Sequence, residues 1–401
     1  MENHGMWQRA WVEIDLDALA DNFRSLKKTL SEKTKLCCVV KANAYGHGAL
    51  AVSALYERLG ADFLAVSNLE EALELRLGGI TLPILILGYT VPDCAALLSK
   101  YKISQCVFSL DYAKALSEAA VRAGVSVKIH VKLDSGMGRI GFSVLHPEER
   151  AKTLSELLLT LSLPALLHEG IFTHFAMSDM GEAGSAFTRR QFAFFEETLE
   201  ALKARGYTFS IRHVSNSAAI ADYPEYELDM VRAGIVLYGY HPSKALKRKL
   251  PLRPALSLCG IVDMVKEIKA GDSVSYGATF VAERPTRVAT VPIGYADGLF
   301  RHIDRASPAF SLCDKKISLL GRICMDQCML DVSEIPEVSV GKTVAFYGKS
   351  GEDIASLAER LGTIPYELIT ALDERLARVY RENGETVLIK NRILPDGYPI
   401  V

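Results

Sequence analysis

The chain has 401 residues, of which 49% are apolar, and a formal net charge of −2. Its length exceeds one average domain, and its apolar content is that of a globular protein. The near-zero charge provides no field to attract nucleic acid or an anionic membrane, so we expect neither as a partner.

The apolar runs are too short to cross a membrane; the longest lie near residues 82–87 and 157–167. Residues 1–9 are polar and lack the apolar core of a signal peptide, so a cytoplasmic protein is expected. The eight cysteines lie mostly in apolar strand-like segments. Cys324 and Cys328 have no second Cys or His pair nearby, so we expect no metal site.

From about residue 12 to 240, strand-like runs alternate with helical patterns. The first four expected strands end at residues 40, 66, 87 and 108. The next four cover residues 127–133, 170–175, 211–214 and 231–238. Expected helices cover 49–59, 69–77, 111–123, 148–161 and 190–205, two of them opened by the capping boxes Ser67-x-x-Glu70 and Thr188-x-x-Gln191. Eight such units predict an α/β fold with a TIM-like (β/α)₈ barrel over residues 12–243. A doubly wound open sheet is the alternative.

A basic, proline-flanked stretch near residues 242–254 is typical of a linker. Beyond it, short strand patterns separated by turns predict a mainly-β C-terminal domain over residues 250–401. Its strands are expected at 256–265, 273–280, 287–292, 317–320, 329–332 and 343–347, with helices at 353–361 and after Pro365. We expect residues 1–11 to pack with this domain.

Lys41 ends an apolar run and is followed by a glycine-containing turn that carries Tyr45. The run has the composition of a buried strand, so Lys41 is expected where that strand meets the turn. Poor hydration there would lower its pKa and make available the neutral amine that forms a Schiff base with an aldehyde. The alternative is a lysine whose ammonium simply reaches solvent.

In a barrel, chemistry gathers at the carboxyl ends of the strands. Several reactive side chains are expected there: Lys41, Tyr45, Lys132, Asp134, Arg139, His174, His213, Ser217, Arg232, Gly234 and Ile235. His174 alone could be a core histidine, and Arg232, inside an apolar strand, needs a partner. That partner is either a neighbouring acid such as Asp229 or an acceptor on a cofactor.

The loop from Asp134 to Gly141 contains the spacing G-x-G-x-x-G. A dinucleotide site is not expected, because the loop belongs to the fifth unit and residues 160–163, where the ribose-binding acid should lie, contain no carboxylate. The pattern instead favours a nest of backbone amides with Arg139 as the fork for an anion. In the second domain Tyr276 precedes Gly-Ala and is either a packed turn aromatic or a base with a lowered pKa.

Together these motifs resemble the alanine racemase family of fold-type-III pyridoxal-phosphate enzymes over nearly the whole chain. The resemblance rests on Val-Lys41-Ala-Asn-Ala-Tyr-Gly-His-Gly, Met-Gly-Arg139, Thr-His174-Phe, Val-Arg232-Ala-Gly-Ile-Val-Leu-Tyr-Gly, Val-Ser-Tyr276-Gly-Ala-Thr and Gly-Arg-Ile-Cys-Met325-Asp326.

The resemblance implies racemisation of alanine with pyridoxal 5′-phosphate (PLP) as cofactor, supplying D-alanine for peptidoglycan. Lys41 would hold PLP and act as the base on the D face, and Tyr276 of the partner subunit would be the base on the L face. His174 would connect Tyr276 to Arg232, which would face the pyridine nitrogen and leave it unprotonated.

The remaining implied roles are binding roles. Arg139 and the Met325 amide would bind the substrate carboxylate, Arg139 would also contact the cofactor's phenolic oxygen, and Lys132 would be carbamylated. Phosphate would be bound by Tyr45, Ser217, Gly234, Ile235 and Tyr366, with His213 near the cofactor. The substrate-access corridor would contain Asp179, Tyr295, Arg301, Arg322 and Asp326.

Because Tyr276 and Lys41 would come from different subunits, the resemblance also implies a homodimer with two shared active sites. Three alternatives remain. The first is a serine or broad-specificity racemase, which retention of Tyr366 disfavours. The second is a non-enzymatic PLP-binding barrel, which lacks a β domain. The third is a decarboxylase of the same fold, which needs an acid where Arg232 stands.

Overall fold

The computed structural model describes residues 9–348 and 351–393, and these divide into two compact units. We call residues 20–44 and 49–253 the barrel unit. Described residues 9–19, 45–48 and those after 253 form the β unit. No helix in either described range is long and apolar enough to cross a membrane.

The barrel unit contains eight parallel strands in the order β10-β2-β3-β4-β5-β6-β8-β9. Hydrogen bonds from the amides of Asp229 and Arg232 to the carbonyls of Arg212 and Ser215 (3.1 and 3.0 Å) join β10 to β9 and nearly close the ring. The expected (β/α)₈ barrel is confirmed. The strands are β2 (Lys35–Val39), β3 (Phe63–Val66), β4 (Ile84–Ile86), β5 (Ile103–Val107), β6 (Val127–Asp134), β8 (Leu166–Phe172), β9 (Ile211–His213) and β10 (Met230–Ala233).

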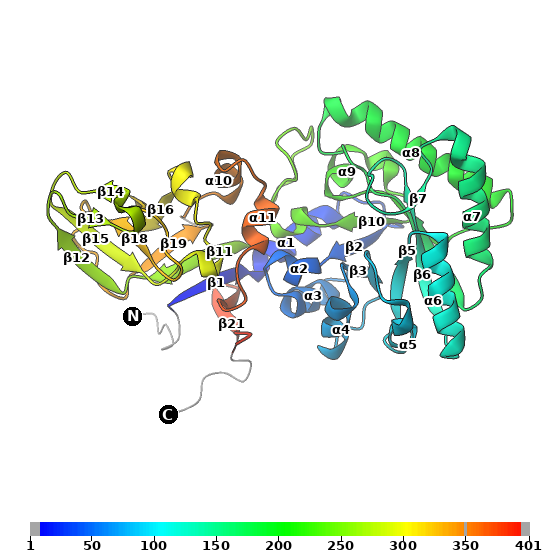
Figure 1. Ribbon diagram of the computed structural model, residues 1–401, viewed down its shortest axis with the longest axis horizontal. Coiled ribbons are helices and arrows are strands. Elements are labelled where there is room, and N and C mark those ends of the chain that lie inside the picture. Colours follow the sequence, from blue (N-terminus) through cyan, green and yellow to red (C-terminus); the bar gives the residue numbers. More distant parts are fainter. Residues whose placement is uncertain (1–8, 349–350, 394–401) are drawn as a thin grey trace. The chain divides into compact units, whose positions relative to one another are not determined.

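Helices cover the outside of this ring (Figure 1). They include α1 (Leu16–Lys27), α3 (Ala49–Arg58), α4 (Leu69–Leu77), α5 (Ala95–Lys100), α6 (Leu110–Arg122), α7 (Arg150–Ser162), α8 (Glu182–Lys203) and α9 (Ser217–Asp222). Residues of β3, β4 and β5 are buried throughout, as expected for parallel strands packed on both faces.

Two expected helix starts differ from the structure. Asn68, not Ser67, caps α4, since its side chain accepts the Glu71 amide hydrogen (2.9 Å). Thr188 lies inside α8, which begins six residues earlier, and its hydroxyl donates to the Gly184 carbonyl (2.9 Å). In both cases a locally valid capping pattern competes with a neighbouring start.

The β unit is built on a seven-stranded sheet in the order β17-β16-β19-β11-β1-β20-β21. Its strands are β1 (Ala10–Asp15), β11 (Leu256–Ile261), β16 (Ala309–Leu312), β17 (Lys315–Ser318), β19 (Thr343–Tyr347), β20 (Ala377–Glu382) and β21 (Glu385–Lys390). Smaller sheets contain β12 (Met264–Ile268), β15 (Thr286–Val291) and β18 (Cys328–Asp331), and β13 (Ser273–Val274) with β14 (Phe280–Val281). The mainly-β C-terminal domain is thereby confirmed, with helices α10 (Ile354–Arg360) and α11 (Pro365–Thr370).

Strand β1 belongs to the sheet of the β unit rather than to the barrel. It pairs antiparallel with β11 and parallel with β20. Residues 12–19, which the sequence pattern assigned to the barrel, therefore lie in the β unit. Residues 9–11 lie there too, while residues 1–8, for which the same packing was expected, are outside the described residues.

Short 3₁₀ helices complete the fold: η1 (Pro92–Cys94), η2 (Pro147–Glu149), η3 (Pro224–Tyr226), η4 (Ile235–Tyr238), η5 (Tyr276–Ala278), η6 (Tyr295–Asp297) and η7 (Ile303–Ala306). A two-residue strand, β7 (Phe142–Ser143), pairs with β6. The expected strand 231–238 stops at Ala233, because Gly234 adopts φ −112° and ψ −109° and η4 follows it.

The chain makes a left-handed turn directly after β2, in the segment labelled α2 (Lys41–Tyr45). Residues 42–45 all have φ between 51° and 53°. Such a conformation costs about 1–2 kcal/mol per residue other than glycine, so surrounding contacts must hold it. The Ala42 amide donates to Glu71 (2.6 Å), and the Asn43 side-chain oxygen accepts from the Ala49 amide (2.7 Å).

We predict that Asn43→Ala loosens this turn, because it removes the acceptor for the first amide of α3. Amide hydrogen exchange at Ala49 should become about tenfold faster, the equivalent of one lost buried hydrogen bond. Asn43→Asp keeps an acceptor of the same length and is the control. Equal exchange rates in Asn43→Ala and Asn43→Asp would show that the side-chain bond does not hold the turn.

Candidate active site

Lys41 follows the carboxyl end of β2, where the sequence places it, and is half-buried. Its burial lowers the pKa of the ammonium, and the nearby Arg139 cation lowers it further, while Glu71 opposes the shift. A larger fraction of Lys41 is therefore the neutral, nucleophilic amine at a given pH.

Arg232 lies in β10 and is 4% exposed. Its Nη1 donates to the Nδ1 atom and the carbonyl of His213 (2.9 and 3.0 Å). Its Nη2 donates to the carbonyls of Thr173 and Val214 (2.8 and 3.1 Å) and to His174 Nδ1 (3.3 Å). Within the described part of the chain, the two terminal nitrogens make all five of these bonds, so Nε remains as the donor for a further acceptor.

No carboxylate neutralises Arg232 among these contacts. Asp229, the structural alternative from the sequence, pairs with Arg212 instead (2.6 Å). Burial lowers the pKa of Arg232 to about 10, which still leaves a cation at neutral pH. The acceptor for Nε must therefore be a ligand or solvent atom that carries a lone pair.

Lys132, in β6, is 3% exposed, and within the described ranges its Nζ atom has no hydrogen-bond partner. The ammonium lies 5.0 Å from the centre of the Phe172 ring. Burial and the charge of Arg232 lower the pKa of Lys132 to about 7, so this amine is partly neutral at physiological pH.

The loop after β6 does not offer the amide nest that its glycines suggested. Asp134 Oδ1 accepts the amide hydrogens of Gly136, Met137 and Gly138 (3.0, 2.9 and 3.1 Å). The chain's own carboxylate occupies the nest, so these amides cannot bind an external anion. Arg139 projects from the same loop as an exposed side chain and keeps its role as the anion-binding candidate.

The loops after β9 and β10 meet at Ser217 and Gly234. The Gly234 amide donates to the Ser217 hydroxyl oxygen (2.9 Å). Asn216 accepts the amide hydrogens of Ala218 and Ala219 and so caps α9 (3.1 and 3.0 Å). Together with Ile235 at the start of η4, these residues stand after the seventh and eighth barrel strands, the common phosphate position in such barrels.

Both histidines predicted from the sequence serve Arg232. His174, directly after β8, accepts through Nδ1, which leaves Nε2 as its donor. His213 uses Nδ1 for Arg232 and Nε2 for His130 (2.8 Å), so it has no nitrogen left for a cofactor. Burial lowers the pKa of both imidazoles far below the usual value, and Arg232 adds to the shift.

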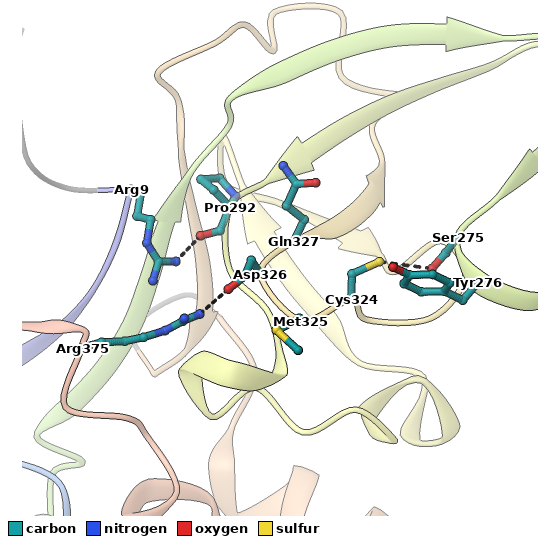
Figure 2. Close-up of a pocket in the computed structure, with 9 residues that line it drawn as sticks. All are labelled: Arg9, Ser275, Tyr276, Pro292, Cys324, Met325, Asp326, Gln327 and Arg375. Atoms are coloured by element: carbon teal, nitrogen blue, oxygen red, sulfur yellow. Dashed lines mark hydrogen bonds and ion pairs between the residues drawn. The ribbon is translucent and has the colours of Figure 1, made fainter.

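The β unit contains its own pocket, a cavity of about 770 Å³. Figure 2 shows its lining: Arg9, Ser275, Tyr276, Pro292, Cys324, Met325, Asp326, Gln327 and Arg375. Tyr276 is 68% exposed and Met325 is 53% exposed, so both predicted site residues present their side chains openly. The Ser275 hydroxyl donates to the Arg322 carbonyl (2.6 Å) and anchors the Tyr276 turn.

Four of the five predicted corridor residues lie in the β unit: Tyr295, Arg301, Arg322 and Asp326. The amide of Tyr295 donates to the Cys324 carbonyl (3.1 Å), and the amide of Ala296 donates to Met325 (3.0 Å). Gly294 permits this approach, since a Cβ atom there would lie 2.3 Å from both carbonyl oxygens.

Two further predicted residues, Tyr45 and Tyr366, pack against each other in the β unit. Their ring centroids are 5.9 Å apart. Asp179 is the one corridor residue that belongs to the barrel unit.

Sequence reasoning missed the ion-pair cluster that supports the pocket. Asp297 is fully buried and accepts from Arg9 (2.6 Å) and Arg375 (2.7 Å). Arg375 also donates to Asp326 (2.8 Å). The available signal was an aspartate between Tyr295 and Gly298 in a turn, but its arginine partners are far away in sequence.

The barrel unit thus presents a nucleophilic lysine, an exposed arginine and a buried arginine whose Nε atom makes no hydrogen bond to the residues that the structure describes. Within the described ranges, no group of three or more His, Cys, Asp or Glu side chains could hold a metal ion. A lysine with a lowered pKa lies at the end of a barrel strand, in the same unit as arginines that can bind anionic groups. This arrangement is that of a barrel enzyme of amine–carbonyl chemistry.

Comparison with known proteins identifies the family. Residues 14–242 match the model of the alanine racemase N-terminal domain, and residues 255–380 match that of the C-terminal domain. The chain is 44% identical over 372 residues to the alanine racemase of Desulfovibrio desulfuricans, covering 93% of this chain and 98% of that one. It is 42% identical to alanine racemase 2 of Caldanaerobacter subterraneus, covering 95% and 97%. This chain belongs to the alanine racemase family, whose enzymes depend on PLP.

Solved structures agree with this assignment. The alanine racemase of Clostridium difficile 630 superposes with a TM-score of 0.91 at 39% identity, covering 96% of this chain and 99% of that one. The Bacillus anthracis alanine racemase with bound L-Ala-P has a TM-score of 0.88 at 34% identity, covering 97% and 99%.

We predict that Asp297→Asn lowers the free energy of unfolding of the β unit by about 3 kcal/mol, because two arginines lose a buried counter-charge. Asp326→Asn removes an exposed partner of Arg375 and should cost under about 1 kcal/mol. Urea unfolding of both variants measures the difference.

We predict that the ion pairs of Asp297 make the stability of the β unit depend on pH. Burial alone raises the pKa of Asp297, but hydrogen bonds from Arg9 and Arg375 lower it below its ordinary value of 3.8. The contribution of the ionised Asp297 carboxylate to the free energy of unfolding is therefore complete above that pH and is lost as the pH falls further. Equal losses of unfolding free energy in Asp297→Asn and Asp326→Asn would show that the buried carboxylate stabilises the β unit no more than the exposed one.

Proposed function

We propose that this chain is a PLP-dependent alanine racemase that interconverts L-alanine and D-alanine by moving a proton at Cα with two bases. The observation that carries the proposal is Arg232. A racemase of this family has an arginine at the pyridine nitrogen, where a decarboxylase needs an acid. Among the residues that the structure describes, Arg232 has no carboxylate partner, and its Nε donor is not used.

The barrel residues fit PLP. Bound PLP supplies an aldehyde that joins the substrate amine and a conjugated ring that acidifies the Cα–H bond. Lys41 provides the amine that tethers PLP, and its lowered pKa favours the neutral form that can take a proton. We assign Lys41 as the base on the D face and Tyr276 as the base on the L face.

His174 would link the two halves of this chemistry. Its Nδ1 atom accepts from Arg232, so its proton is on Nε2, which we propose donates to the Tyr276 phenol oxygen. An arginine that keeps its proton leaves the pyridine nitrogen unprotonated and weakens electron withdrawal by the ring. Proton return to Cα would then compete well with side reactions.

Substrate and phosphate binding follow from the remaining residues. We propose that Arg139 binds the substrate carboxylate and the cofactor's phenolic oxygen, with the Met325 amide on the same carboxylate. Phosphate would be bound by the residues after the last two barrel strands together with the two packed tyrosines: Ser217, Gly234, Ile235, Tyr45 and Tyr366. His213 would act on the cofactor only through Arg232.

We further propose that Lys132 is carbamylated. A neutral buried amine can add to carbon dioxide through its nitrogen and lose one proton, which converts the side chain into an anion. The pKa of about 7 supports this, as does the lack of a hydrogen-bond partner for Nζ among the described residues, since the anion would offset Arg139 and Arg232.

Exposure of Tyr276 and Met325 supports a homodimer with shared sites. Large side chains that the family places against substrate are open to solvent in the single chain. We propose that each active site combines Lys41 of one subunit with Tyr276 of the other. The corridor residues Asp179, Tyr295, Arg301, Arg322 and Asp326 would line access to it.

The β unit and Tyr366 decide between the alternatives. A non-enzymatic PLP-binding barrel lacks the β domain that is present here. A serine racemase would have a smaller residue at 366, so alanine is the favoured substrate, although rejection of one hydroxyl is weak. We propose that the D-alanine serves peptidoglycan synthesis.

We predict that the purified holoenzyme converts L-alanine to D-alanine faster than it racemises L-serine or L-lysine. Borohydride reduction should fix PLP on the peptide that contains Lys41, as mass spectrometry would show. Lys41→Ala should abolish both results. Label on another lysine, or no D-alanine, would refute the assignment.

The shared site makes a second prediction. Lys41→Ala and Tyr276→Phe should each be inactive alone, but a mixture unfolded and refolded together should recover about a quarter of wild-type activity. Half of randomly assorted dimers are mixed, and each mixed dimer has one intact site. No recovery in dimers shown to be mixed would place both bases in one subunit.

A further inference from the structure

A line of polar side chains runs through the interior of the barrel and ends at Arg232. We call Glu169, His130, His213 and Arg232 the inner chain. Glu169 Oε2 lies 3.2 Å from His130 Nε2, and His130 Nδ1 lies 2.8 Å from His213 Nε2. His213 Nδ1 lies 2.9 Å from Arg232 Nη1. Both histidines are 0% exposed.

The chemistry of the donors fixes the direction of every bond in the inner chain. A guanidinium can only donate, so His213 Nδ1 accepts from Arg232. A neutral imidazole that accepts at Nδ1 carries its proton on Nε2, so His213 donates to His130 Nδ1. His130 then carries its proton on Nε2 and donates to Glu169.

The far end of the inner chain is built to remain a carboxylate. Lys128 donates to Glu169 Oε1 (2.6 Å), and the Ser104 hydroxyl donates to Oε2 (2.5 Å). Although burial alone raises the pKa of Glu169, hydrogen bonds from His130, Lys128 and Ser104 lower it to about 2. Glu169 therefore stays an acceptor across the physiological range.

The backbone is shaped to admit these rings. The ladder between β6 and β8 shifts register after Ile129, where His130 pairs with Gly170 and Glu169 becomes the extra residue. Such a bulge re-aims the side chain that it carries. A Cβ atom at Gly170 would lie 2.4 Å from His130 Nδ1, so only glycine leaves room for the imidazole. Phe172 stacks on His213 with centroids 4.7 Å apart.

We propose that Glu169 is a positioning residue for the racemase reaction, acting through the tautomers of His130 and His213 on the guanidinium of Arg232. The inference rests on the proposed function. If the hydrogen bonds of the inner chain ran in the opposite direction, His213 would present an N–H to the N–H of Arg232, and the guanidinium would have to move. A carboxylate at the far end of the barrel thereby decides where Nε of Arg232 points.

The test compares the wild-type holoenzyme with Glu169→Leu, labelled with ¹⁵N at histidine. Histidine ¹⁵N spectra distinguish a protonated from an unprotonated Nδ1. We expect His213 Nδ1 to be unprotonated in the wild type and partly protonated in Glu169→Leu. We expect kcat for alanine to fall at least about tenfold, with KM within about twofold, since a buried charge-assisted bond is lost.

Two controls touch the same carboxylate without removing the acceptor. Ser104→Ala and Lys128→Met each delete one donor to Glu169, so both should keep the wild-type His213 tautomer and kcat within about threefold. Glu169→Gln keeps the side-chain size and serves if Glu169→Leu does not fold. Its amide either accepts from His130 through oxygen or donates to it through nitrogen. We expect kcat to stay close to the wild-type value if the spectrum shows the wild-type His213 tautomer, and to fall if Nδ1 of His213 is protonated.

The proposal is overturned if Glu169→Leu keeps the wild-type His213 tautomer, or if kcat falls in either Glu169 variant without a change of tautomer. It is also overturned if the controls lose as much kcat as Glu169→Leu. The spectra need no substrate, so a wild-type protein that does not racemise alanine would refute the proposed function while leaving the tautomer result readable.

Discussion

The barrel site depends on one buried cation held without a counter-charge. Arg232 is fixed by three carbonyls and two imidazoles, all of which accept and none of which is ionised. Burying a lone charge is costly unless its donors are satisfied, and here five bonds satisfy the two terminal nitrogens. Orientation follows from the same contacts, because the planar guanidinium has no freedom to rotate. The same contacts therefore fix the direction of the remaining donor, the Nε–H group.

The positive charge gathered near Arg232 explains the rest of the barrel's electrostatics. Burial lowers the pKa of Lys41 and Lys132, and nearby positive charge lowers it further, from Arg139 at Lys41 and from Arg232 at Lys132. Burial, together with the charge of Arg232, keeps His174 and His213 neutral, so they serve as acceptors with defined tautomers. A site made of cations and neutral imidazoles needs anionic oxygen atoms to balance its positive charge. A phosphate, a phenolic oxygen, a substrate carboxylate and a carbamate would supply them.

Much of the architecture could be predicted from the sequence, since each barrel unit carries its own hydrophobic period and turn residues. The eight strands and the mainly-β domain needed no tertiary information. Locally ambiguous signals were resolved differently by the structure: Asn68 replaced Ser67 as a cap, and Asp134 filled the nest formed by its own loop. β20 and β21 were missed, since their charged residues hide the strand pattern, and β21 is exposed along its whole length. For the cap and the nest, the missing information was which polar group accepts from the amide.

The sequence by itself determined the residue types at the strand ends and, through their motifs, the family. Lys41, Arg139, His174, Arg232 and Tyr276 could be singled out because local pattern locates strand ends and turns. Only the tertiary structure decided that Asp229 leaves Arg232 to the histidines, that β1 joins the β unit, and that Glu169 stands at the end of the inner chain. The physical reason is common to all three: a hydrogen bond between residues far apart in sequence depends on strand register and on a bulge, and neither is written in the local pattern of either partner.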